Sequence, residues 1–258
     1  MLHHAGLLAR SEGDAFGVIN PDGAGDILIV CEHASSRLPA SVGNLGLTDE
    51  VLKSHVAWDP GALAVAERLS AAFDAPLVYQ QFSRLVYDCN RPPESPGAMP
   101  EVSEIYEIPG NRNLSEQERD ARTKALYLPF HRRVEEVIEA RAAAGRGTVL
   151  VTMHSFTPVY FGKQREVEIG ILHDDDARFA DAMLSACGDL DSPYRVRRNE
   201  PYGPADGVTH TLNLHAKSRG MLNVMIEVRN DLIADEAGQA RAADYLEELL
   251  KQALQKNS

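Results

Sequence analysis

Two histidines and one glutamate stand at the ends of apolar runs, where their side chains could meet a substrate. His33 closes the run DILIVCEH, His154 follows TVLVTM, and Glu227 lies near the end of MLNVMIEVR. A neutral imidazole is a good zinc ligand, and a carboxylate beside a metal can act as a general base. Two histidines and a carboxylate delivered to one place therefore indicate metal-assisted hydrolysis.

Each of these residues also has a purely structural interpretation. A lone histidine at the end of a strand is more often a structural residue, hydrogen-bonded to nearby backbone. Glu227 could pair with Arg229, which has the same side-chain direction in a strand, because a buried carboxylate needs a partner. Small or hydroxyl residues follow both histidines. This repetition supports a shared metal site as strongly as the structural interpretation.

A second group of polar residues lies in the segment SRLVYDCNRP, which contains Arg84, Asn90 and Arg91. A guanidinium group can bind a carboxylate through two parallel hydrogen bonds, so these arginines are candidate anchors for an acidic substrate. The alternative is a turn with solvated arginines. Asp59 is ambiguous in the same way: it is either a metal ligand or the N-cap of a helix that starts at Pro60.

Several common catalytic motifs are absent from the sequence. It has no GxSxG elbow, P-loop or GxGxxG pattern, which disfavours a serine hydrolase, a kinase and a dinucleotide-dependent enzyme. It also has no HExxH pattern, so a metal site would have to be assembled from distant segments.

The elements that must position these residues alternate between strands and helices, which predicts an α/β sheet with helices on both faces. We expect one domain over residues 1–258, with 90–113 as an elaborated loop. Ser115 and Glu118 form a capping-box signature, and Pro129 predicts a kink or break in the helix that follows. The expected strands are 26–32, 76–81, 84–87, 148–153, 167–172, 194–199 and 224–228, and the expected helices are 59–73, 115–144, 175–187 and 236–251.

The net charge of −12 argues against nucleic acid and anionic membrane surfaces as partners. It does not argue against a small anionic substrate, which needs only a local basic pocket. The three cysteines are far apart, as in a reduced cytoplasmic protein. We expect no signal peptide in MLHHAGLLAR and no membrane helix, because no run of 18 apolar residues occurs.

Six segments together resemble the N-formylglutamate amidohydrolase family, from about Ile27 to Leu232. They are CEHASSRLP, WDPGALAVAERL, SRLVYDCNRP, VTMHSF, NEPYGPADGVTH and MIEVRNDLI. The family is similar in fold to zinc carboxypeptidases, which implies a three-layer fold with a mixed, mostly parallel sheet and one catalytic zinc. It also implies His33 and His154 as metal ligands and Glu227 as the acid/base. Asn90 and Arg91 would hold a substrate carboxylate, with Arg84 assisting.

The sequence departs from the carboxypeptidase pattern at the third metal ligand. Carboxypeptidases take two ligands from an HxxE segment, whereas Ser36 stands at the corresponding position after His33. We predict Asp59 as the third ligand, with Glu32 as the next choice. The implied substrate is a small anionic N-acyl amino acid such as N-formyl-L-glutamate. The alternatives are a carboxypeptidase or other deacylase, and a small-molecule binding protein without catalysis.

Overall fold

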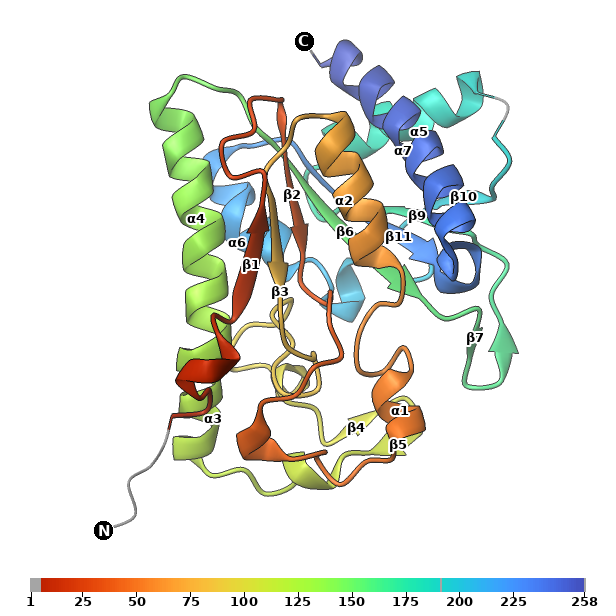
Figure 1. The fold of residues 1–258 in the computed structure, drawn as a ribbon. Coiled ribbons are helices and arrows are strands. Elements are labelled where there is room, and N and C mark those ends of the chain that lie inside the picture. Colours follow the sequence, from red (N-terminus) through yellow and green to blue (C-terminus); the bar gives the residue numbers. More distant parts are fainter. Residues whose placement is uncertain (1–5, 191, 258) are drawn as a thin grey trace.

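The computed structural model describes residues 6–190 and 192–257, and its centre is a seven-stranded sheet (Figure 1). Strands β3, β2, β6 and β11 run parallel, whereas β1 is antiparallel to β3 and β9 is antiparallel to β11. The carboxyl ends of β2, β6 and β11 therefore meet at one edge. In spatial order the strands are β1 (Phe16–Ile19), β3 (Leu77–Gln80), β2 (Ile27–Cys31), β6 (Val149–Phe156), β11 (Asn223–Arg229), β9 (Ile169–Leu172) and β10 (Val196–Arg198).

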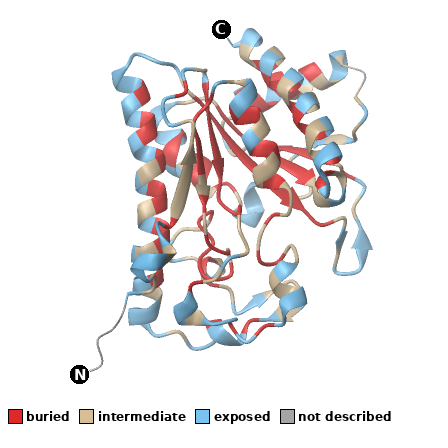
Figure 2. Ribbon diagram, viewed as in Figure 1, coloured by how far each residue is buried: buried red, intermediate tan, exposed pale blue. Residues whose placement is uncertain are grey.

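Helices cover both faces of the sheet, because alternate side chains of each strand point to opposite sides. Ile27 and Ile29 of β2 belong to the hydrophobic cluster that includes α2 (Ala62–Ala72), α5 (Arg178–Asp189) and α7 (Glu236–Lys256). Leu28 and Val30 belong to the cluster that includes α4 (Leu128–Ala143) and α6 (His210–His215). Figure 2 shows the sheet buried between these layers, which explains why β2 is apolar throughout.

Short elements lie beyond the carboxyl ends of β2 and β3 (Figure 1). They include α1 (Asp49–Lys53) and a hairpin of β4 (Val102–Ser103) and β5 (Tyr106–Glu107), which falls within region 90–113. A second hairpin, β7 (Val159–Tyr160) with β8 (Lys163–Gln164), follows β6. The 3-10 turns are Arg10–Glu12, Ala40–Val42, Pro96–Ala98, Pro109–Asn111, Pro204–Asp206, Lys217–Arg219 and Asn230–Ile233.

The predicted fold class, a three-layer α/β fold with a mixed, mostly parallel sheet and helices on both faces, is confirmed. The capping box is also confirmed, since Ser115 caps α3 (Glu116–Arg122) and Glu118 returns the contact. A π-helical turn over Thr123–Tyr127 joins α3 to α4, so the regular helix is interrupted just before Pro129, as expected for a residue without a backbone N–H.

Two local predictions are wrong. Residues 84–87 form a turn and not a strand, and the place beside β3 is taken by β1, whose residues carry no clear strand pattern. The helix predicted from Asp59 begins only at Ala62, after Gly61 at the N-cap with φ of 81°. A Cβ at Gly61 would lie 2.4 Å from the Ile233 carbonyl oxygen, so this turn requires glycine. Asp59 therefore does not cap the helix.

None of the helices within 6–190 and 192–257 is long and apolar enough to cross a membrane.

Candidate active site

The parallel strands β6 and β11 bring His154 and Glu227 to the same point of the sheet edge. The two residues are register partners, and both have the side-chain direction of Leu150 and Met225, which face α4 and α6. His33 follows the end of the neighbouring strand β2. The three residues singled out in the sequence therefore line one cavity of about 300 Å³.

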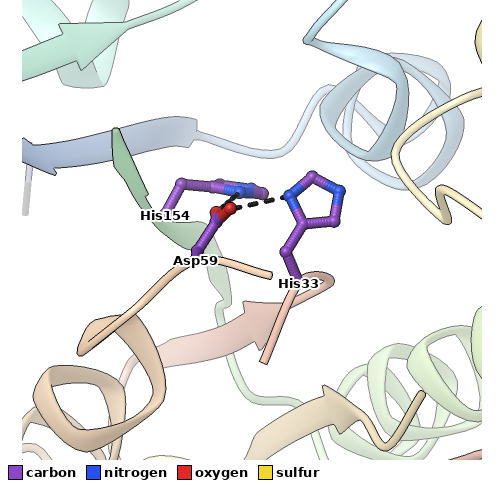
Figure 3. Close-up of side chains that lie close together, drawn as sticks. All are labelled: His33, Asp59 and His154. Carbon is purple, nitrogen blue, oxygen red and sulfur yellow. Dashed lines mark hydrogen bonds and ion pairs between the residues drawn. The ribbon is translucent and has the colours of Figure 1, made fainter. Parts of the chain in front are cut away.

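Asp59 lies between the two histidines, as Figure 3 shows. Its Oδ2 atom is 2.9 Å from His154 Nδ1 and 3.3 Å from His33 Nδ1. The donor atoms of these three buried residues lie within 4.8 Å of one another, so the group could hold a metal ion. This is the set of residues predicted as metal ligands.

Each histidine has a carboxylate on the far side of its ring. His33 Nε2 forms a hydrogen bond of 2.7 Å with Asp88 Oδ1. His154 Nε2 lies 3.1 Å from Glu32 Oε2, an ion-pair distance without hydrogen-bond geometry. A carboxylate behind a ligating histidine fixes the hydrogen on the distant nitrogen and turns the other lone pair toward the metal. Glu32, the second choice for a metal ligand, thus lies on the side of the His154 ring that faces away from Asp59.

The donor set therefore fits a cation. With hydrogens on both Nε2 atoms, the two Nδ1 lone pairs and Asp59 Oδ2 face one another and repel unless a proton or a metal ion lies between them. Protons can meet this need: although burial opposes it, Glu32 and Asp59 raise the pKa of His154 well above its usual value. Burial and Arg84 likewise oppose charge on His33, but Asp88 and Asp59 still raise its pKa.

Glu227 lines the cavity, and the described chain leaves its carboxylate poorly satisfied. It is 4% exposed, and within the described chain its Oε2 atom has no hydrogen-bond partner. Burial raises its pKa to about 7. The alternative Glu227–Arg229 pair does not form, since Arg229 instead contacts Asp231 at 2.8 Å and Glu168 at 3.5 Å. A carboxyl group with this pKa can both accept and donate a proton near neutral pH.

Arg84, Asn90 and Arg91 line the same cavity, but their side chains are engaged differently. Arg84 joins Asp88 at 2.7 Å to Asp59 at 3.3 Å. The amide of Asn90 donates to the Val208 carbonyl and accepts from the backbone N–H of Thr211.

Arg91 also lines the cavity, and its guanidinium forms no ion pair with a carboxylate of the described chain. One of its nitrogens donates to the Asp206 carbonyl at 2.6 Å, but no carboxylate of the described chain lies within 4.0 Å of the guanidinium. Its charge is therefore available to an anion that enters the cavity.

Sequence reasoning missed Asp88 and Tyr202, which both line the cavity. Asp88 occurs in the quoted segment SRLVYDCNRP, yet only its contact with His33, 55 residues away, shows that it belongs to the site. Burial and the nearby Glu227 raise the pKa of Tyr202 to about 12, so its hydroxyl keeps its proton. Tyr202 lies in the NEPYGPADGVTH segment, and no local pattern marks it as a cavity residue.

The chain is similar to known proteins over most of its length. A profile of the N-formylglutamate amidohydrolase family matches residues 25–234. A gene product of Agrobacterium tumefaciens of solved structure is 63% identical, with a TM-score of 0.95 over 97% of this chain and 98% of that one.

A more distant structure is that of an N-formylglutamate amidohydrolase from Ralstonia eutropha JMP134. It is 20% identical, with a TM-score of 0.63 over 93% of this chain and 97% of that one, a likeness in fold alone. No functionally curated protein matches the chain. Because the family profile spans most of its length, the chain belongs to the N-formylglutamate amidohydrolase family of hydrolases.

Proposed function

We propose that this protein is a zinc-dependent amidohydrolase that cleaves N-acyl derivatives of acidic amino acids, with N-formyl-L-glutamate as the model substrate. The observation that carries the proposal is the cluster of His33, Asp59 and His154 beside the partly unsatisfied Glu227. Membership of the family supports the reaction type. The cavity of about 300 Å³ suits a small acylated amino acid.

His33, Asp59 and His154 would hold the metal. A zinc ion there would supply a Lewis acid for the acyl carbonyl and would make a water molecule more acidic. The hydrogen bond with Asp88 keeps the His33 ring in the tautomer that such a ligand set needs, and the charge of Glu32 lies beside Nε2 of His154. Arg84 adds a positive charge that contacts both Asp59 and Asp88, and together with His33 it favours the ionised form of Asp88.

Glu227 would move the proton. As a carboxylate it takes a proton from the attacking water, while the water oxygen forms a bond to the acyl carbon. As a carboxylic acid it returns that proton to the amide nitrogen when the carbon–nitrogen bond breaks. Water and amide are thereby converted into formate and a free amino acid. Burial raises the pKa of Glu227 above that of an exposed carboxyl group, which favours uptake of the proton from water.

Arg91 would bind a carboxylate of the substrate, since its guanidinium has no carboxylate partner in the described chain. Asn90 and Arg84 border the same space, and the contacts of Asn90 with Val208 and Thr211 hold the segment that carries Arg91. A substrate fixed in this way presents its acyl group to Glu227 in one orientation, which removes much of the entropic barrier to attack.

The test is hydrolysis by the zinc-loaded protein of a panel of N-formyl-L-glutamate, N-acetyl-L-glutamate, N-formyl-L-leucine and a dipeptide, with release of the free amine as the readout. We expect the acidic N-acyl amino acids to be cleaved fastest. Glu227→Gln should lower kcat about 100- to 10,000-fold, the range for loss of a general acid–base. Glu136→Gln on the exposed side of α4 is the control.

Two results would contradict the proposal. One is a zinc-loaded protein that hydrolyses no N-acyl amino acid of the panel. The other is a Glu227→Gln variant that keeps the wild-type rate. Preferential cleavage of the dipeptide would instead identify a carboxypeptidase.

A further inference from the structure

We propose that Glu104 fastens the hairpins β4–β5 and β7–β8 into one roof over the cavity, and that this roof limits the size of the substrate that the site accepts. The inference rests on the proposed hydrolysis of small N-acyl amino acids for its substrate class. The contact itself can be tested without any substrate.

Glu104 joins three segments that are far apart in the sequence. It lies in the turn between β4 and β5, and its side chain is only 10% exposed. Its Oε1 atom accepts a hydrogen bond of 3.0 Å from the backbone N–H of Phe161, in the turn between β7 and β8. Its Oε2 atom lies 2.9 Å from Nε2 of His55, just after α1. Both carboxylate oxygens are thus used to connect separate elements.

Both turns adopt a backbone conformation that is unfavourable for residues with side chains. Glu104 has φ of 53° and Phe161 has φ of 47°, in the left-handed region that favours glycine. The two residues that make the contact therefore sit in turns that need outside support to keep their shape.

Apolar packing provides little of that support. No residue of either hairpin belongs to the two hydrophobic clusters of the core. Instead Val102, Ile105, Val159 and Phe161 expose their side chains to solvent. The guanidinium of Arg165 does stack on Tyr160, with its Cζ atom 4.4 Å from the centre of the Tyr160 ring. Segments with few buried apolar contacts open at low free energy, so the polar contact through Glu104 contributes a large share of what holds the hairpins together.

The hairpins also form part of the cavity wall. Ser103, Glu104 and Tyr160 line the cavity that contains His154 and Glu227. In Figure 1, β4, β5 and α1 lie beyond the carboxyl edge of the sheet, on the side where β2 delivers His33. Separation of the hairpins would therefore widen the space above the reacting groups, and a longer acyl chain would fit.

The first measurement is hydrogen exchange of the Phe161 backbone amide in the zinc-loaded full-length protein. Loss of a hydrogen bond to a charged acceptor corresponds to about tenfold faster exchange or more, so we expect this increase for Glu104→Ala. Glu104→Gln keeps one acceptor oxygen and should show a smaller increase. Glu107→Ala is the matched control, because Glu107 lies in the same hairpin but pairs with Arg112 and does not line the cavity.

The second measurement is kcat/KM for N-formyl-, N-acetyl- and N-butyryl-L-glutamate. We expect Glu104→Ala to raise the butyryl-to-formyl ratio of kcat/KM at least fivefold over that of the wild type and of Glu107→Ala, with Glu104→Gln in between. Unchanged exchange at Phe161 would overturn the fastening role. Faster exchange with an unchanged ratio would overturn the size limit. If the wild type cleaved none of these substrates, the proposed function and the size limit would both be refuted. The exchange data alone would still decide whether Glu104 holds the two hairpins together.

Discussion

Asp88→Asn should weaken zinc binding without removing any of the three proposed ligands. Asp88 Oδ1 lies 2.7 Å from Nε2 of His33, and Oδ2 lies 2.7 Å from a guanidinium nitrogen of Arg84. The asparagine has nearly the same shape, but its neutral oxygen is a weaker acceptor for the His33 N–H. The imidazole then becomes less basic and less firmly oriented toward the metal.

The size of the effect follows from the contacts of Asp88. A hydrogen bond to a charged group is worth about 1.5–3 kcal/mol, and each 1.4 kcal/mol changes a dissociation constant tenfold. Asp88 is 4% exposed, so salt screens this interaction little. We therefore expect the Kd for zinc to rise about 10- to 100-fold. Arg84 would keep only its longer contact with Asp59, which draws that ligand away from the metal and acts in the same direction.

The assay is competition for zinc between the protein and a chromophoric chelator, with circular dichroism to check that the variant is folded. Asp120→Asn is the matched control. Asp120 lies on α3 and forms an exposed ion pair with Lys124, so this variant removes the same charge at a site far from the cavity. A Kd for Asp88→Asn within twofold of that of the control would refute the reasoning, since it would mean that the carboxylate behind His33 does not tune the ligand.

Three other predictions test separate parts of the site and the fold. Glu32→Gln should raise the Kd for zinc about tenfold through His154, as the same competition assay would show, and wild-type affinity would contradict the role of this carboxylate. Arg91→Ala should raise KM for N-formyl-L-glutamate about 10- to 100-fold, with a smaller change in kcat; an unchanged KM in steady-state kinetics would exclude Arg91 as the anchor. Burial lowers the pKa of His215 to about 4, whereas the pKa of a histidine in the unfolded chain is about 6.5. The folded state therefore favours the neutral ring. Its contribution to stability is complete above pH 6.5 and is lost as the pH falls toward 4. The stability difference between wild type and His215→Gln, measured by denaturant unfolding, should therefore be about 2 kcal/mol larger at pH 7 than at pH 5, and a difference independent of pH would contradict the shift.

The sequence alone determined the features that depend on neighbouring residues. Apolar runs predicted β2, β6 and β11 because a strand buried on both faces needs apolar side chains at every position. The capping box at Ser115 predicted the start of α3 because its contacts span three residues. The polar residues that end or interrupt these runs, His33, His154 and Glu227, could likewise be recognised as exceptions to the local pattern.

Only the tertiary structure decided which distant side chains contact these polar residues. Asp59 could be read as a helix cap or a metal ligand. The cap is excluded because Gly61 takes the cap position, and Asp59 instead contacts His154, 95 residues further along the chain. Asp88 contacts His33 across 55 residues, and Asn90 contacts Thr211 across 121. Contacts of this kind leave no periodic signal, because they depend on which strands become neighbours in the sheet. Strand order is set by the packing of the whole chain, and with it the set of charges around the cavity.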